Sequence, residues 1–63
     1  MDDEDKIKPG DIVNVHFERT YCEWGVTVLY MPVATGDSWI LRRPGDRSLV
    51  YVQTFSKIEK VTP

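Results

Sequence analysis

The sequence predicts an all-β domain in which five short strands form a small closed or half-closed barrel. Three observations support this prediction. Apolar and polar residues alternate over short runs, as in half-buried strands. Glycine- and proline-rich turns separate these runs. No segment predicts a long helix. We expect a barrel because closure removes the sheet edges that a single small antiparallel sheet leaves exposed.

Length and charge are consistent with one small domain. The chain has 63 residues, a formal net charge of −2 and a pI of about 5.1. Four of its ten carboxylates lie within the first five residues, whereas the remainder has eight basic and six acidic residues. We therefore predict a flexible acidic tail over residues 1–6 and a single, slightly basic barrel domain over residues 7–63.

Several classes of protein are disfavoured by simple absences in the sequence. Cys22 is the only cysteine, so a disulfide within the chain and a cysteine-based zinc cluster are excluded. No apolar run approaches the roughly 20 residues that span a membrane, and the acidic N-terminus does not resemble a secretory signal. We expect a cytoplasmic protein that does not contact a membrane.

The first strand is predicted over residues 11–18. Its alternation places one set of apolar residues on the buried face: Val13, Val15 and Phe17. Asn14 and His16 are expected on the outer face. The following residues, 18–23, are polar and predict a loop.

The second strand is predicted over residues 24–34, where β-branched and aromatic residues favour a strand over a helix. Gly25 near its start suggests a bulge or a close approach of another backbone segment. Pro32 suggests an edge, a bend or a strand end, because proline cannot donate to a ladder. Residues 35–37 then turn the chain.

A hairpin is predicted next, from a strand over residues 38–43, a turn over 44–47 and a strand over 48–55. In the turn we expect Gly45 to take a positive φ. After it, we predict a single helical turn from Ser56 to Glu59 and a short closing strand over residues 60–62.

Three Gly-Asp pairs raise the question of a metal or phosphate site. Asp11, Asp37 and Asp46 follow glycines at separate turns, and no calcium-loop or phosphate-loop motif occurs. His16 and Cys22 are close enough in sequence to meet, but nothing indicates an activated thiolate. We predict strand corners, no enzyme, no metal and no cofactor.

Aromatic residues and arginines are the best candidates for a binding surface. Small barrels bind extended peptides or methylated side chains through aromatics that lie beside loops. A basic cluster near an aromatic can hold an acidic partner or a phosphate backbone. The candidate binding residues are Tyr21, Trp24, Trp39, Arg42, Arg43 and Arg47. The alternatives are that the two tryptophans close the ends of the core and that the arginines solvate a hairpin.

The order of these segments resembles the SH3-like small-barrel superfamily, which includes SH3, Tudor and KOW modules. The resemblance rests on KPGDIVNV as a first strand, GDSWILRRPGDRSLVYV as a central hairpin and FSKIEKV as the ending, and it covers residues 7–62. The chain lacks the acidic ALYDY-type stretch of SH3 domains and a KOW signature. Its compactness is also similar to that of small uncharacterised proteins from bacteria and their phages.

We rank three functions from these observations. The first is a non-enzymatic module for protein–protein interaction that uses the exposed aromatics and the arginine-bearing hairpin. The second is an assembly or structural component that self-associates as a homo-oligomer. The third is a nucleic-acid-binding barrel, which the acidic pI disfavours.

Overall fold

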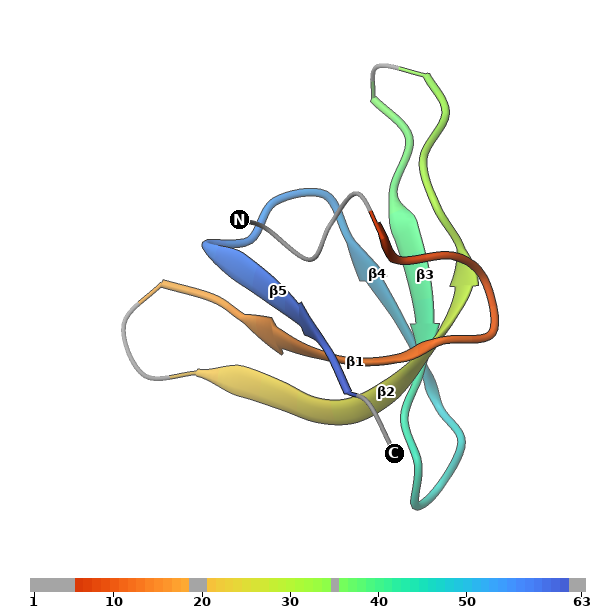
Figure 1. The fold of residues 1–63 in the computed structure, drawn as a ribbon, viewed down its shortest axis with the longest axis vertical. Helices are drawn as coiled ribbons and strands as arrows, with labels where there is room; N and C mark the ends of the chain where they lie inside the picture. Colours follow the sequence, from red (N-terminus) through yellow and green to blue (C-terminus); the bar gives the residue numbers. More distant parts are fainter. Residues whose placement is uncertain (1–5, 19–20, 35, 62–63) are drawn as a thin grey trace.

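The computed structural model describes residues 6–18, 21–34 and 36–61. These residues form one antiparallel sheet with the strand order β4-β3-β2-β1-β5 (Figure 1). The strands are β1 (Ile12–His16), β2 (Cys22–Tyr30), β3 (Trp39–Arg42), β4 (Leu49–Val52) and β5 (Lys57–Lys60). The predicted all-β class and the number of strands are confirmed.

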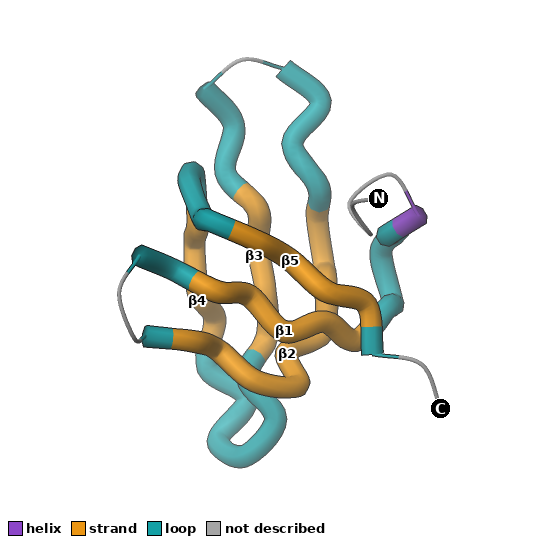
Figure 2. Tube along the Cα trace, turned by 60° about the vertical axis from the view of Figure 1, so that its left-hand side comes forward, coloured by secondary structure: helices purple, strands orange, loops and turns teal. Residues whose placement is uncertain are grey.

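The core lies on the inner face of this single sheet. Every strand contributes to it, together with Ile7 ahead of β1, and its members are Ile7, Val13, Val15, Val26, Val28, Trp39, Leu41, Val52 and Ile58. The described residues form no second layer, and a sheet in that situation buries its inner face by curling, which its right-handed twist favours. Figure 2 shows the strands arranged around this shared interior.

The curled sheet is open rather than closed. In the described part of the chain, β4 forms a ladder with β3 alone and β5 forms a ladder with β1 alone. Only residues 53–56 connect β4 to β5, so the chain passes from one edge strand of the sheet to the other through a four-residue connection. The closed form of the predicted barrel is not seen among these residues.

A β-bulge near the start of β2 decides which side chains face the core. Trp24 and Gly25 together lie opposite the single residue Asn14 of β1. Gly25 has a φ of 66°, and its N–H donates to Asn14 Oδ1 at 2.8 Å. The predicted bulge at Gly25 is therefore confirmed. Because the bulge inserts one residue, it reverses the in–out alternation on its N-terminal side, so that Glu23 faces inward and Trp24 outward.

The predicted helical turn from Ser56 to Glu59 is wrong, because β5 occupies Lys57–Lys60. Pairing with β1 engages the backbone of alternate residues of this segment, and alternation carries the Ile58 side chain into the core, where it is 4% exposed. The Ser56 N–H, expected at a helix cap, donates instead to the carbonyl of His16 at 2.8 Å. Of the predicted closing strand, Thr62 lies outside the described residues, as do residues 1–5 of the predicted tail.

The loop and turn predictions also need correction at two places. The segment expected as a loop at residues 18–23 already belongs to β2 from Cys22 onward. In the turn between β3 and β4, the residue with a positive φ is Arg47, at 63°, and not Gly45. The turn is held by the Asp46 carboxylate, which accepts a hydrogen bond from the Ser48 N–H at 3.0 Å.

Candidate functional site

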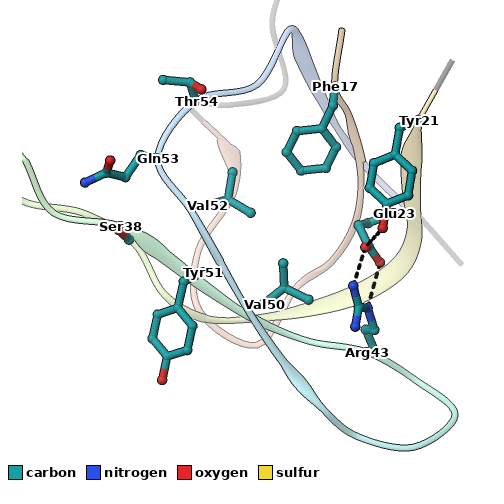
Figure 3. Close-up of a pocket in the computed structure, with 10 residues that line it drawn as sticks. All are labelled: Phe17, Tyr21, Glu23, Ser38, Arg43, Val50, Tyr51, Val52, Gln53 and Thr54. Carbon is teal, nitrogen blue, oxygen red and sulfur yellow. Dashed lines mark hydrogen bonds and ion pairs between the residues drawn. The ribbon is translucent and has the colours of Figure 1, made fainter. Parts of the chain in front are cut away.

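An open hollow of about 530 Å³ lies beside β4, where the curled sheet does not close (Figure 3). We call it the seam hollow. Its apolar lining is Phe17, Val50 and Val52, and these side chains point toward its centre. Its polar wall is Tyr21, Glu23 and Arg43, and Ser38, Tyr51, Gln53 and Thr54 complete its rim.

The polar wall is built around the one charged side chain that is buried among the described residues. Glu23 is 7% exposed. Arg43, which follows β3, donates two hydrogen bonds to the Glu23 carboxylate, from Nε to Oε1 at 3.1 Å and from Nη2 to Oε2 at 2.7 Å. The Tyr21 hydroxyl donates to Oε2 as well. A bidentate arginine–carboxylate pair of this kind fixes the orientation of both side chains.

The charges of this wall balance at neutral pH. The hydrogen bonds from Arg43 lower the pKa of Glu23, and they outweigh its burial, which acts in the opposite direction. The hydrogen bond to Glu23 raises the pKa of Tyr21, and the same carboxylate raises the pKa of Arg43. Glu23 is therefore ionised, Tyr21 protonated and Arg43 charged. The wall carries no net charge and holds no group that gains or loses a proton near pH 7.

Among the residues that the structure describes, no backbone segment pairs with the outer edge of β4, which we call its free edge. The Arg43 N–H donates to the Ser48 carbonyl at 2.8 Å, and hydrogen-bonded pairs alternate along an antiparallel ladder. From this register, Val50 and Val52 direct their backbone groups toward β3. Leu49 and Tyr51 direct their N–H and C=O groups away from β3, toward the open side of the sheet.

The two edges of the sheet differ in their charges. Along β5, the side chains of Lys57, Glu59 and Lys60 carry charge. Along β4 and the two residues after it, the run LVYVQT carries none. Charged residues on an edge strand oppose pairing with another chain, and an uncharged edge lacks this protection. The β4 edge is therefore the one suited to accept a further strand.

The structure brings together two of the six predicted binding residues. Tyr21 and Arg43 meet at Glu23 in the wall of the seam hollow. Trp24 lies on the outer face, 64% exposed, with its ring 5.6 Å from that of His16 in an edge-on contact. The sequence did not decide which tryptophan is exposed, and the structure shows that it is Trp24.

The other three predicted residues lie elsewhere. Trp39 is 5% exposed and packs edge-on against Phe55 at 5.7 Å, so it belongs to the core and does not serve as an exposed anchor. Arg42 lies on the outer face, beside Thr27 of β2. Arg47 is exposed in the turn before β4. The predicted basic cluster is thus divided among the hollow, the outer face and the turn.

Glu23 was missed by the sequence reasoning, although a signal was present. A carboxylate at the beginning of an apolar strand, followed by a bulge-forming glycine, is placed inside by the change in alternation. The free edge of β4 was also missed. Its signal is the absence of any charge in LVYVQT.

His16 and Cys22 face one another across β1 and β2, as their spacing allowed. Burial, reinforced by the nearby Glu59 and Glu23 carboxylates, raises the pKa of the Cys22 thiol. The thiol is therefore held in its protonated form, which is not the form that attacks. His16 Nε2 lies 2.6 Å from Glu59 Oε1, so the ring is engaged in a pair on the outer face.

The three Gly-Asp aspartates make structural contacts at separate corners. Asp11 accepts a hydrogen bond from the Lys8 N–H at 3.0 Å and pairs with Lys60 Nζ of β5 at 3.4 Å, and Asp37 accepts a hydrogen bond from the Tyr30 hydroxyl at 3.1 Å. Asp46 holds the turn before β4, as described above. Within residues 6–18, 21–34 and 36–61, no three side chains of the metal-binding types gather as ligands.

A membrane-crossing helix, long and apolar enough for that purpose, does not occur among the residues that the structure describes. Comparison of the chain with protein-family models, curated proteins and solved structures finds no match in any of the three. The resemblance to SH3-like barrels therefore stays a prediction, and the features that bear on function are the seam hollow and the free edge of β4.

Proposed function

We propose that this chain is a non-enzymatic interaction module, built as an open variant of the SH3-like small barrel. In this proposal it binds an extended segment of another protein, which adds to the sheet along β4. The observation that carries the proposal is the coincidence of an uncharged free edge and a preformed hollow on the same strand.

Strand addition supplies affinity through the backbone and selectivity through alternate side chains. The N–H and C=O groups of Leu49 and Tyr51 are directed outward, ready to pair with the added segment. Alternate side chains of that segment point to the inner side of the sheet. There they reach the apolar lining formed by Phe17, Val50 and Val52. The volume of the hollow lies within the range of small-molecule pockets, so it has room for such side chains.

The chemistry of the wall indicates which segment fits. Because Glu23 and Arg43 neutralise one another, the hollow offers no uncompensated charge to a charged side chain. A charged group placed there would lose its hydration without gaining a partner. We therefore expect a segment with aliphatic or aromatic residues at alternate positions and no charge between them.

Selection from a random library of segments of about ten residues tests this proposal. Tyr51→Pro removes the outward N–H of the edge but leaves the ladder with β3, and Tyr51→Thr is the matched control that keeps this N–H. Relative to Tyr51→Thr, we expect Tyr51→Pro to weaken binding of the selected segments by about tenfold. Equal binding by the two variants, or selection of no alternating apolar segment, would contradict the proposal.

The nucleic-acid alternative has less support. Of the three arginines that suggested it, Arg43 lies in the wall of the hollow with its guanidinium bound to Glu23, so Arg42 and Arg47 alone would have to hold the phosphates. A mobility-shift titration at low salt is the check, because phosphate binding strengthens steeply as salt is reduced. Tight binding of a single strand that Arg42→Ala and Arg47→Ala together abolish would favour this alternative over the interaction module.

A further inference from the structure

We propose that the free edge of β4 also accepts β4 of a second copy of this chain, in an antiparallel pair centred on Tyr51. The inference rests on the same edge as the proposed function, and it names a specific partner for that edge. Three observations carry it: the uncharged edge, the register of the outward backbone groups and the distribution of charge along the hairpin.

The second copy supplies a segment of the kind that the edge accepts. Its own LVYVQT run is uncharged and rich in β-branched and aromatic residues, and the LVYV part of it is already an extended strand. Nothing has to fold for the pair to form, since β4 is held in its conformation by β3 in both copies. A flexible segment would lose conformational entropy on binding, and a preformed strand avoids most of that loss.

The register of the strand makes the pair self-complementary. Leu49 and Tyr51 turn their backbone groups outward, and β4 ends at Val52, before a bend at Gln53. With a two-fold axis at Tyr51, the two Tyr51 residues form a hydrogen-bonded pair at the centre of the joined strands. On the inner side, Val50 of each copy lies opposite Val52 of the other, so the two seam hollows lie on one face of a joint sheet.

The charges favour an antiparallel pair over a parallel one. Arg42 and Arg47 both lie at the hairpin end of β4, whereas Asp37 lies at its other end, where the Gln53 side chain donates to the Gly36 carbonyl. An antiparallel pair separates the two arginine-bearing hairpins and sets each one toward the Asp37 end of the other copy. A parallel pair would place four arginines at the same end.

Self-pairing would cover the edge that the proposed function uses. A bound segment and a second copy would therefore compete, and dilution would release the site. Such competition regulates binding through concentration alone and requires no change in the fold.

Amide hydrogen exchange of the intact chain at about 20 µM and about 2 mM tests this inference. For a pair with a Kd near 100 µM, mass action predicts that exchange at Leu49 and Tyr51 slows by about fivefold at the higher concentration. The Ile58 amide is the internal control, because Ile58 lies on the other edge strand and its backbone is directed away from β1. Sedimentation should show a mass rising from 7.3 kDa toward twice that value. Tyr51→Thr should retain this rise, and Tyr51→Pro should abolish it.

A mass that stays at 7.3 kDa at both concentrations would overturn the inference. An equal slowing of hydrogen exchange at the Ile58 amide would also overturn the inference, since it would show that β4 pairs with β5 of the other copy. Segment binding, measured at about 20 µM where the monomer dominates, is a separate readout. If selected segments bind while the chain stays monomeric, only the self-pairing fails. If the chain pairs with itself but binds no segment, only the proposed function fails.

Discussion

Glu23 and Val26 lie three residues apart on β2, yet both side chains are buried on the same face of the sheet. Strict alternation would place them on opposite faces. The bulge at Trp24 and Gly25 removes the discrepancy, because it adds one residue between them. The whole polar wall of the seam hollow depends on this one inserted residue.

Replacing the bulge glycine is therefore expected to be costly. Gly25→Ala should lower the free energy of unfolding by about 1 kcal/mol, because a φ of 66° is strained for alanine although no atom would meet the added carbon. Gly45→Ala is the matched control. Its φ is not positive, so thermal unfolding should show no loss and up to about 0.5 kcal/mol of gain. Equal losses in the two variants would contradict this account of Gly25.

Removing the arginine from the wall should leave a buried carboxylate without its main partner. Arg43→Ala is expected to lower the melting temperature by about 10 °C. Arg42→Ala, one residue earlier and on the outer face, should lower it by no more than about 2 °C. In the Glu23→Gln background the effect of Arg43→Ala should shrink, because the unpaired charge is absent. A loss of the same size in that background would show that Arg43 acts through packing and not through Glu23.

Stability should fall in acid. The pKa of Glu23 lies below its ordinary 4.5 in the folded chain, so its contribution is present above pH 4.5 and is lost as the pH falls through the lowered value. Glu59, Asp11 and Asp46 have lowered pKa values and act in the same direction. Chemical unfolding between pH 2 and pH 7 should show this decline. The slope of the free energy of unfolding against pH reports the number of protons taken up on unfolding, and Glu23→Gln should reduce that number by up to about one. An unchanged slope would show that Glu23 does not contribute to the decline.

The two tryptophans should respond oppositely to solvent and to mutation. Iodide should quench the fluorescence of the exposed Trp24 and leave that of the buried Trp39 nearly unchanged. The variants Trp24→Phe and Trp39→Phe each keep one tryptophan, so the two signals can be measured separately. Trp39→Leu should destabilise the fold by about 2–4 kcal/mol because it leaves a cavity in a small core. Trp24→Leu should change the stability by no more than about 0.5 kcal/mol. Comparable destabilisation by both substitutions would contradict the assignment of Trp39 to the core.

Much of the fold was predictable from local pattern. The alternation around Val13 and Val15 was visible in the sequence, as was the shared face of Trp39 and Leu41, although not the side of the sheet to which that face turns. A bulge was one of two interpretations of Gly25, and the structure contains it. The segment at Lys57–Lys60 was not, because KIEK is compatible with a helical turn until β1 offers its backbone for pairing. A short segment adopts the conformation in which neighbouring segments can pair with its backbone N–H and C=O groups.

The candidate site was less predictable, because its parts come from distant positions. Arg43 was chosen for its charge, but its partner Glu23 lies 20 residues away, and only the pairing of β2 with β3 brings the two together. The free edge of β4 is a property of strand order, which no local pattern specifies.

By itself, the sequence determined the all-β class, the segments that form β1 to β4 and the positions of the turns between them, because these follow from side-chain periodicity and turn chemistry over a few residues. Tertiary structure alone decided that Glu23 is inside and Trp24 outside, that Arg43 neutralises Glu23, and that β4 has a strand partner on one side only within the described residues. The physical reason is that register, bulge and strand order are set by contacts between segments far apart in the chain. The alternation of each segment restricts these contacts but does not choose among them.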